Sequence, residues 1–114
     1  MSLKRREVIW TEDAVREMEE IVEFIALDDP QSAMRMAERL VKLADGLVTT
    51  PFRGRVVPEL DRIGHHGHRE VIVSPYRIMY RVLPGKVIVD LVIDGRRNVE
   101  DYLGRKLWGG RARY

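Results

Sequence analysis

The sequence lacks cysteine, long apolar runs and internal repeats. Without cysteine among its 114 residues, the chain has no disulfide framework and no thiolate metal site. No apolar stretch approaches the roughly 18 residues that a membrane-spanning helix needs, so we expect no membrane partner. Because the chain also shows no secretory signal, these absences lead us to expect a cytoplasmic protein.

Net charge is small, at +2, but it is unevenly distributed. Residues 1–50 hold 7 basic and 11 acidic side chains, a net charge of −4, whereas residues 51–114 hold 13 basic and 7 acidic side chains, a net charge of +6. This asymmetry indicates an anionic partner for one face, either nucleic acid or an acidic protein. A solvated surface without a ligand explains the charge equally well.

Apolar residues recur at helical spacing in the first half of the chain. Thr11 is a good N-cap for a helix that ends near Leu27. Asp29 is expected to cap a second helix that starts with Pro30 and ends before Pro51. Because the connection is very short, the two helices should form an antiparallel hairpin.

After residue 51 the pattern changes to the alternation that is typical of strands. The predicted elements are a strand at residues 8–10, strands at residues 55–57, 69–73, 76–82 and 86–94, and one or two helical turns at residues 99–103. The order β-α-α-β-β-β-β predicts the α+β class, with the helical hairpin packed on a mainly antiparallel sheet. We expect one domain over residues 1–114, with a mobile tail over residues 104–114.

The strand at residues 76–82 has an unusual composition. It carries Arg77 and Arg81 on one face with Met79 between them, and its partner strand is almost wholly apolar. By alternation, Tyr80 points to the opposite face, where we expect it to be buried or half-buried.

Three segments follow the helical hairpin in a fixed order: TPFRGRVVPEL at residues 50–60, REVIVSPYRIMYRV at residues 69–82 and VIVDLVIDGRRN at residues 87–98. Together they resemble the RelE/ParE superfamily, the toxins of type II toxin–antitoxin systems, over residues 7–103. The resemblance implies a cognate antitoxin that wraps the toxin and inserts into its basic groove. It also implies one of two activities: RelE-like and YoeB-like members cut mRNA in the ribosomal A site, and ParE-like members inhibit DNA gyrase without being nucleases.

The resemblance assigns roles to particular residues. In a nuclease, Arg77 would clamp the phosphate, Arg69 would be a second cation, and Glu59 would be the general base for the ribose 2′-OH. Arginine suits the first role because its planar fork can hold two phosphate oxygens. Glu59 is also interpretable as an ordinary loop carboxylate, and Arg69 and Glu70 as members of cross-strand ion pairs.

The chain departs from the nuclease pattern at the end of the last strand. Asp94 stands where RNase members place a histidine or tyrosine, and an aspartate is normally ionised at pH 7 and has no proton to donate. This departure favours a ParE-like inhibitor of DNA gyrase or a degenerate member that only binds its antitoxin. A metal-independent mRNA endonuclease is the alternative. The groove that would bind the antitoxin or an anionic target is expected on one sheet face and at its end, with these residues: Arg69, Arg77, Arg81, Arg96 and Arg97.

The segment GHHGH at residues 64–68 brings three histidines together. A structural zinc site needs four ligands and the chain has no cysteine, so we expect a flexible loop and no metal or cofactor. His68 lies beside Arg69 and is a candidate acid or base near the groove. The oligomeric state is open between a homodimer and a toxin–antitoxin hetero-oligomer.

Overall fold

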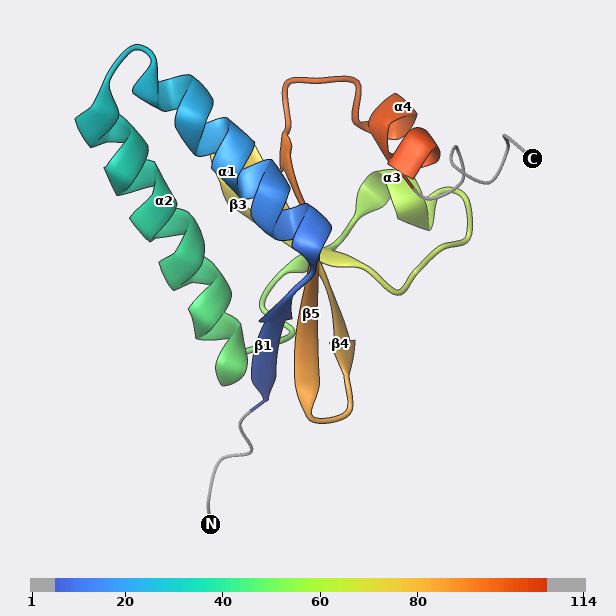
Figure 1. Ribbon diagram of the computed structural model, residues 1–114. Coiled ribbons are helices and arrows are strands. Elements are labelled where there is room, and N and C mark those ends of the chain that lie inside the picture. Colours follow the sequence, from blue (N-terminus) through green and yellow to red (C-terminus); the bar gives the residue numbers. More distant parts are fainter. Residues whose placement is uncertain (1–5, 107–114) are drawn as a thin grey trace.

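The structure, a computed structural model, describes residues 6–106. In chain order its elements are β1 (Glu7–Trp10), α1 (Glu12–Ala26), α2 (Pro30–Asp45), a 3-10 turn η1 (Gly46–Val48), β2 (Arg55–Val56), α3 (Pro58–Asp61), β3 (Arg69–Val73), β4 (Tyr76–Leu83), β5 (Lys86–Asp94) and α4 (Val99–Gly104). The five strands form one sheet in the order β1-β5-β4-β3-β2. Only β1 pairs in parallel, with β5. This arrangement confirms the predicted α+β class and the mainly antiparallel sheet (Figure 1).

Local capping fixes where the helical hairpin begins and turns. Thr11 Oγ1 accepts a hydrogen bond from the backbone N–H of Ala14 at 3.1 Å, and Asp29 Oδ1 accepts from two backbone N–H groups in the first turn of α2. Both caps were predicted. The second helix ends at Asp45 and is followed directly by the 3-10 turn η1. It therefore ends before the position at which Pro51 would stop a helix.

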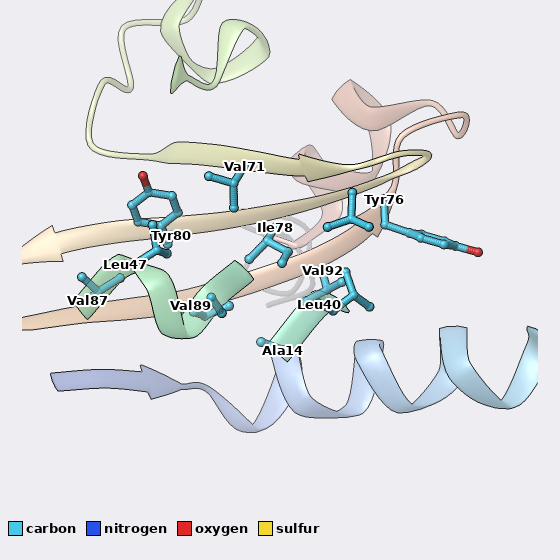
Figure 2. Packing of buried hydrophobic residues seen from close by; sticks show 12 residues of the cluster. Ala14, Leu40, Leu47, Val71, Tyr76, Ile78, Tyr80, Val87, Val89 and Val92 are labelled. Atoms are coloured by element: carbon cyan, nitrogen blue, oxygen red, sulfur yellow. The ribbon is translucent and has the colours of Figure 1, made fainter. Parts of the chain in front are cut away.

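The helical hairpin covers one face of the sheet. Ala14 and Leu40 from the helices meet Ile78, Tyr80 and Val89 from the strands, and all five side chains are fully buried (Figure 2). The burial of Tyr80 was predicted from alternation. This layer is the larger of two apolar clusters and holds the strands at fixed positions.

The opposite face of the sheet is covered by α3 and α4, which lie next to each other in Figure 1. Met79 and Leu91 from the sheet contact Leu60 of α3 and Leu103 of α4 there. The sequence does not predict the helix α3, since its segment has the pattern of a loop. It consists of one turn that starts at Pro58, a residue favoured at the first helical position.

A β-bulge in β5 keeps both faces of the sheet apolar. Met79 pairs with Leu91, but the next residue, Tyr80, pairs with Val89, so that Asp90 has no partner in β4. Without the extra residue, Val89 and Leu91 would face the same side, since side chains alternate along a strand. The bulge therefore separates them onto the two faces.

The chain leaves α4 close to the start of α1. Lys106, in the segment predicted to be a mobile tail, forms ion pairs at 2.9 Å with Asp13 and Glu17. Residues 107–114 of that predicted tail lie outside the described residues. Within residues 6–106, no helix combines the length and the apolar character that crossing a membrane requires.

Candidate functional site

Arg77 lies at the centre of a network of carboxylates. Its Nη1 and Nη2 donate to the two carboxylate oxygens of Glu59 at 2.9 and 2.7 Å, and its Nε donates to Glu70 Oε1 at 2.6 Å. The residue is only 7% exposed. These charge-assisted bonds, that to Glu59 foremost, raise the pKa of Arg77 above its ordinary value. The planar fork that the sequence analysis assigned to phosphate is thus occupied by the chain's own carboxylates.

Glu59 and Glu70 reach Arg77 from different elements. Glu59 lies on α3, so it is not the loop carboxylate of the alternative interpretation. Glu70 comes from β3, is fully buried as a side chain, and also accepts from Arg55 Nε at 2.6 Å. The cross-strand ion pairs considered for this region therefore exist for Glu70.

Arg69 lies on the opposite face of the sheet from Arg77. It pairs across the ladder with Tyr80, which points to the helical hairpin. Its Nη1 donates to the backbone carbonyl of Gly54 at 2.8 Å, and its guanidinium lies 5.2 Å from the ring centroid of Phe52. The prediction of one sheet face that carries Arg69 together with Arg77 and Arg81 is therefore wrong for Arg69, because the strand register sends its side chain the other way.

Arg81 does share the face of Arg77, and it too has a carboxylate partner. Its Nε and Nη2 donate to the two oxygens of Asp90 at 2.5 and 3.0 Å. Asp90 is the bulged residue of β5, and its carboxylate lies on the same face of the sheet as Arg81.

The end of β5 presents two exposed arginines. Arg96 donates from its backbone N–H and its Nε to Asp94 Oδ1 and from Nη2 to Asp94 Oδ2, at 2.9, 3.0 and 2.7 Å. These bonds hold the pKa of Asp94 below its ordinary value, so the carboxylate is ionised at neutral pH. Arg97 lies over the ring of Tyr102, with its guanidinium carbon 5.1 Å from the ring centroid.

An open pocket of about 430 Å³ adjoins these arginines, between α1, the end of β5 and α4. Phe24, Tyr76 and Tyr102 give it aromatic walls, and Asp94 and Arg97 lie at its rim. Phe24 is 69% exposed, which is unusual for a side chain of this kind. The phenol of Tyr102 donates to Glu17, and burial together with this bond raises the pKa of Tyr102. Its proton is therefore held at neutral pH.

The sequence analysis did not find Glu17, which organises this corner. Glu17 is buried, and it also accepts from the backbone N–H of Val92 at 3.1 Å and from Lys106 at 2.9 Å. One signal was available: Glu17 falls between Ala14 and Ile21, on the apolar side of an otherwise amphipathic helix.

The carboxylates of this site predict an acid-labile fold. Arg77 lowers the pKa of Glu59, and at Asp90 the hydrogen bonds from His68 and Arg81 outweigh the effect of burial, so that its pKa is lowered too. A carboxylate whose pKa is lower in the folded state makes its full contribution to stability at pH values above its pKa in the unfolded state, near 4. This contribution is lost as the pH falls through its pKa in the folded state. We expect urea midpoints that are constant from pH 7 to about 5 and fall steeply below about 4. Glu59→Gln should flatten this fall, and midpoints that rise below pH 4 would contradict it.

The histidine segment GHHGH does not assemble a metal site in the described part of the chain, since residues 6–106 hold no group of three or more potential ligands. Two of its histidines instead form a hydrogen-bonded chain with Asp90.

Comparisons with known proteins bear on this geometry. Residues 8–99 match the family described as the ParE toxin of the type II toxin–antitoxin system parDE. The toxin RelE2 of Caulobacter vibrioides is 37% identical over 81 residues, which are 71% of this chain and 85% of that protein. Y4kP of Sinorhizobium fredii is 34% identical over 82 residues, which are 70% of this chain and 79% of that protein.

A solved structure shares the fold. The chromosomal ParDE toxin–antitoxin system from P. aeruginosa superposes with a TM-score of 0.63 over 80% of this chain and 97% of that one, at 17% identity. A hairpin of helices on a mainly antiparallel sheet is thus a fold that also occurs in a solved ParDE system. The chain belongs to the ParE toxin family of type II toxin–antitoxin systems.

Proposed function

We propose that this protein is a ParE-like toxin of the cytoplasm, which stops growth by binding DNA gyrase and cuts no nucleic acid. A cognate antitoxin would neutralise it, in a toxin–antitoxin hetero-oligomer. Support for the partner comes from the match to the parDE family and from the fold shared with a ParDE system.

One observation carries this proposal: the guanidinium nitrogens of Arg77 are already bound to carboxylates of the chain itself. A phosphate would have to displace Glu59, which holds two of the guanidinium nitrogens, while Glu70 holds the third. The two carboxylates also neutralise the charges of Arg77 and Arg55, so the network offers a phosphodiester no excess positive charge. Arg77 is better suited to a structural role than to catalysis.

Of the described residues in this corner, neither Asp94 nor Tyr102 is suited to donate a proton to the leaving oxygen. Arg96 keeps Asp94 ionised, and Tyr102 donates its proton to Glu17. Neither group has a proton available for the 5′ oxygen that RNA cleavage releases. Both observations favour inhibition by contact.

The pocket beside Arg97 is the surface that we assign to the partner. Exposed Phe24 supplies an apolar anchor, and the exposed Arg97 lies beside it among the carboxylates of Glu17, Glu20 and Asp94. Aromatic residues and arginine dominate the energetics of protein interfaces, so we assign Phe24 and Arg97 to the contact with an antitoxin or with gyrase.

A ribosome-dependent mRNA endonuclease is the second candidate. One observation favours it: the structure brings together Glu59 and Arg77, the base and the phosphate clamp implied by the resemblance. The relative in Caulobacter vibrioides carries the name RelE2. In this function, Arg77 would exchange Glu59 for phosphate when RNA binds.

Inducible expression in a bacterium separates the candidates. We expect growth arrest with altered plasmid supercoiling or DNA breaks, and an unchanged map of mRNA 5′ ends. Arg97→Glu should raise the expression level needed for arrest by about tenfold or more, because the arginine assigned to the interface is replaced by a residue of opposite charge. Arg35→Glu, a charge reversal at an exposed arginine on α2, is the matched control and should leave arrest unchanged.

Each other outcome identifies a different function. Cuts at fixed codon positions with normal supercoiling would overturn the proposal and establish the endonuclease. No growth defect at all would indicate a degenerate member that only binds its antitoxin.

A further inference from the structure

The segment between α3 and β3 carries a chain of hydrogen bonds that the proposed function does not use. His65 Nε2 lies 3.0 Å from His68 Nδ1, and His68 Nε2 lies 2.9 Å from Asp90 Oδ2. His68 is only 4% exposed, whereas His65 is half-buried. These hydrogen bonds thus connect the bulged residue of β5 to a histidine with access to solvent.

The chemistry of Asp90 fixes where the protons lie. Burial raises the pKa of Asp90, but hydrogen bonds from His68 and Arg81 outweigh it, so the carboxylate is ionised and only accepts. An ionised Asp90 requires His68 Nε2 to donate, and in a neutral His68 ring Nδ1 is then an acceptor. His65 Nε2 must therefore donate to it, and His65 Nδ1 is left with a free lone pair.

His65 opens on a pocket of about 410 Å³ whose charges are balanced. Its other charged lining groups are Asp13, Arg81, Asp90 and Lys106. Arg81 is paired with Asp90, and Lys106 is shared between Asp13 and Glu17, which lies outside the lining. The lining has no net charge while both histidines are neutral, and one positive charge after His65 gains a proton.

Two of these cations keep donors that the rest of the described chain does not use. Arg81 gives only Nε and Nη2 to Asp90, and within residues 6–106 its Nη1 has no hydrogen-bond partner. Lys106 uses two of three ammonium protons on Asp13 and Glu17. With a proton on His65 Nδ1, three residues that line the same pocket each have a donor to offer.

We propose that this pocket is a binding site for a phosphate-type oxyanion, and that protonation of His65 switches the site on. The proton goes to Nδ1, so His65 keeps its bond to His68 and gains a donor that points to the anion. Affinity should rise as the pH falls through the range in which histidines titrate. The anion is either a free oxyanion or a phosphodiester of nucleic acid, and this site is separate from the pocket assigned to the protein partner.

Titration with sulfate followed by ¹H–¹⁵N NMR tests the proposal, because the charge of sulfate is constant over the pH range used. We expect shifts centred on His65, Arg81 and Lys106, with affinity at least about tenfold higher at pH 5.5 than at pH 8, because each linked proton changes affinity by up to tenfold per pH unit. The imidazole nitrogen shifts at high pH should show both His65 and His68 protonated at Nε2.

Matched variants separate binding from a merely structural role of the segment. His65→Gln should keep the fold and lose the pH dependence, whereas His66→Gln should behave as the parent, since His66 is exposed and bonded to Asp61. A short RNA oligonucleotide that shifts the same signals would identify nucleic acid as the source of the anion, and sulfate binding alone would identify a free oxyanion. No binding at either pH, equal affinity at both, or Nδ1 protonation of His68 would overturn the proposal.

Discussion

Glu70→Gln should destabilise the fold by about 2–4 kcal/mol, although it leaves the size of the side chain almost unchanged. Glu70 is fully buried and accepts from the Nε groups of Arg55 and Arg77. A glutamine has one oxygen and one NH₂ group, so it would leave a donor facing one of the two guanidinium groups. Breaking a buried ion pair costs about 3–5 kcal/mol, and Glu59 reduces this cost because it remains bound to Arg77. Urea denaturation measures the difference in the free energy of unfolding.

Glu100→Gln is the matched control for this change. Glu100 pairs with Arg62 at 3.0 Å, but both side chains are more than 60% exposed. An exposed pair contributes roughly 0–1 kcal/mol, so the same substitution should have little effect there. Equal changes in the free energy of unfolding at the two positions would show that the Arg77 network does not stabilise the face of the sheet that α3 and α4 cover.

Gly54→Ala should destabilise the fold by roughly 2–3 kcal/mol through overpacking. A Cβ at Gly54 would lie 2.4 Å from the backbone oxygen of Glu70 and 2.6 Å from the phenol oxygen of Tyr80. Neither atom has room to move, because Glu70 belongs to a paired strand and Tyr80 is fully buried. The Tyr80 oxygen also accepts from the backbone N–H of Gly54 at 3.0 Å, so the clash would break this bond. The free energy of unfolding in urea is again the measurement.

Gly67→Ala is the corresponding control. Among residues 6–106, and apart from its two chain neighbours, no heavy atom lies within 4 Å of a Cβ placed there. The two variants therefore differ in the contacts that the added methyl group meets. A Gly54→Ala protein as stable as its Gly67→Ala counterpart would contradict the close packing of β2 against β3.

The sequence predicts the helical hairpin well because local forces determine it. Thr11 and Asp29 cap their helices through contacts within three residues, and the apolar stripes have the period of the helix. The one-turn helix α3 was missed because four residues are too few to show a period. The bulge at Asp90 was missed because β5 is apolar on both sides, so its sequence says little about which residue faces which layer.

The site could be predicted only in part, because its contacts join distant segments. The shared face of Arg77 and Arg81 follows from alternation within one strand. The position of Arg69 depends on its register with Tyr80, and the sequence of a single strand does not contain that register. The partners of Arg77 are 7 and 18 residues away, on separate elements, so the filling of its fork by carboxylates is a tertiary property.

Inhibition by contact, with no chemistry at Arg77, is the central claim. The most direct test adds purified protein to DNA gyrase in a supercoiling assay and, in parallel, to ribosomes that are translating a defined mRNA. We expect that gyrase is inhibited, that Arg97→Glu weakens this inhibition by about tenfold or more, and that the mRNA stays intact. Unaffected gyrase together with cleaved mRNA would contradict it and would mean that Arg77 releases Glu59 to hold a phosphate.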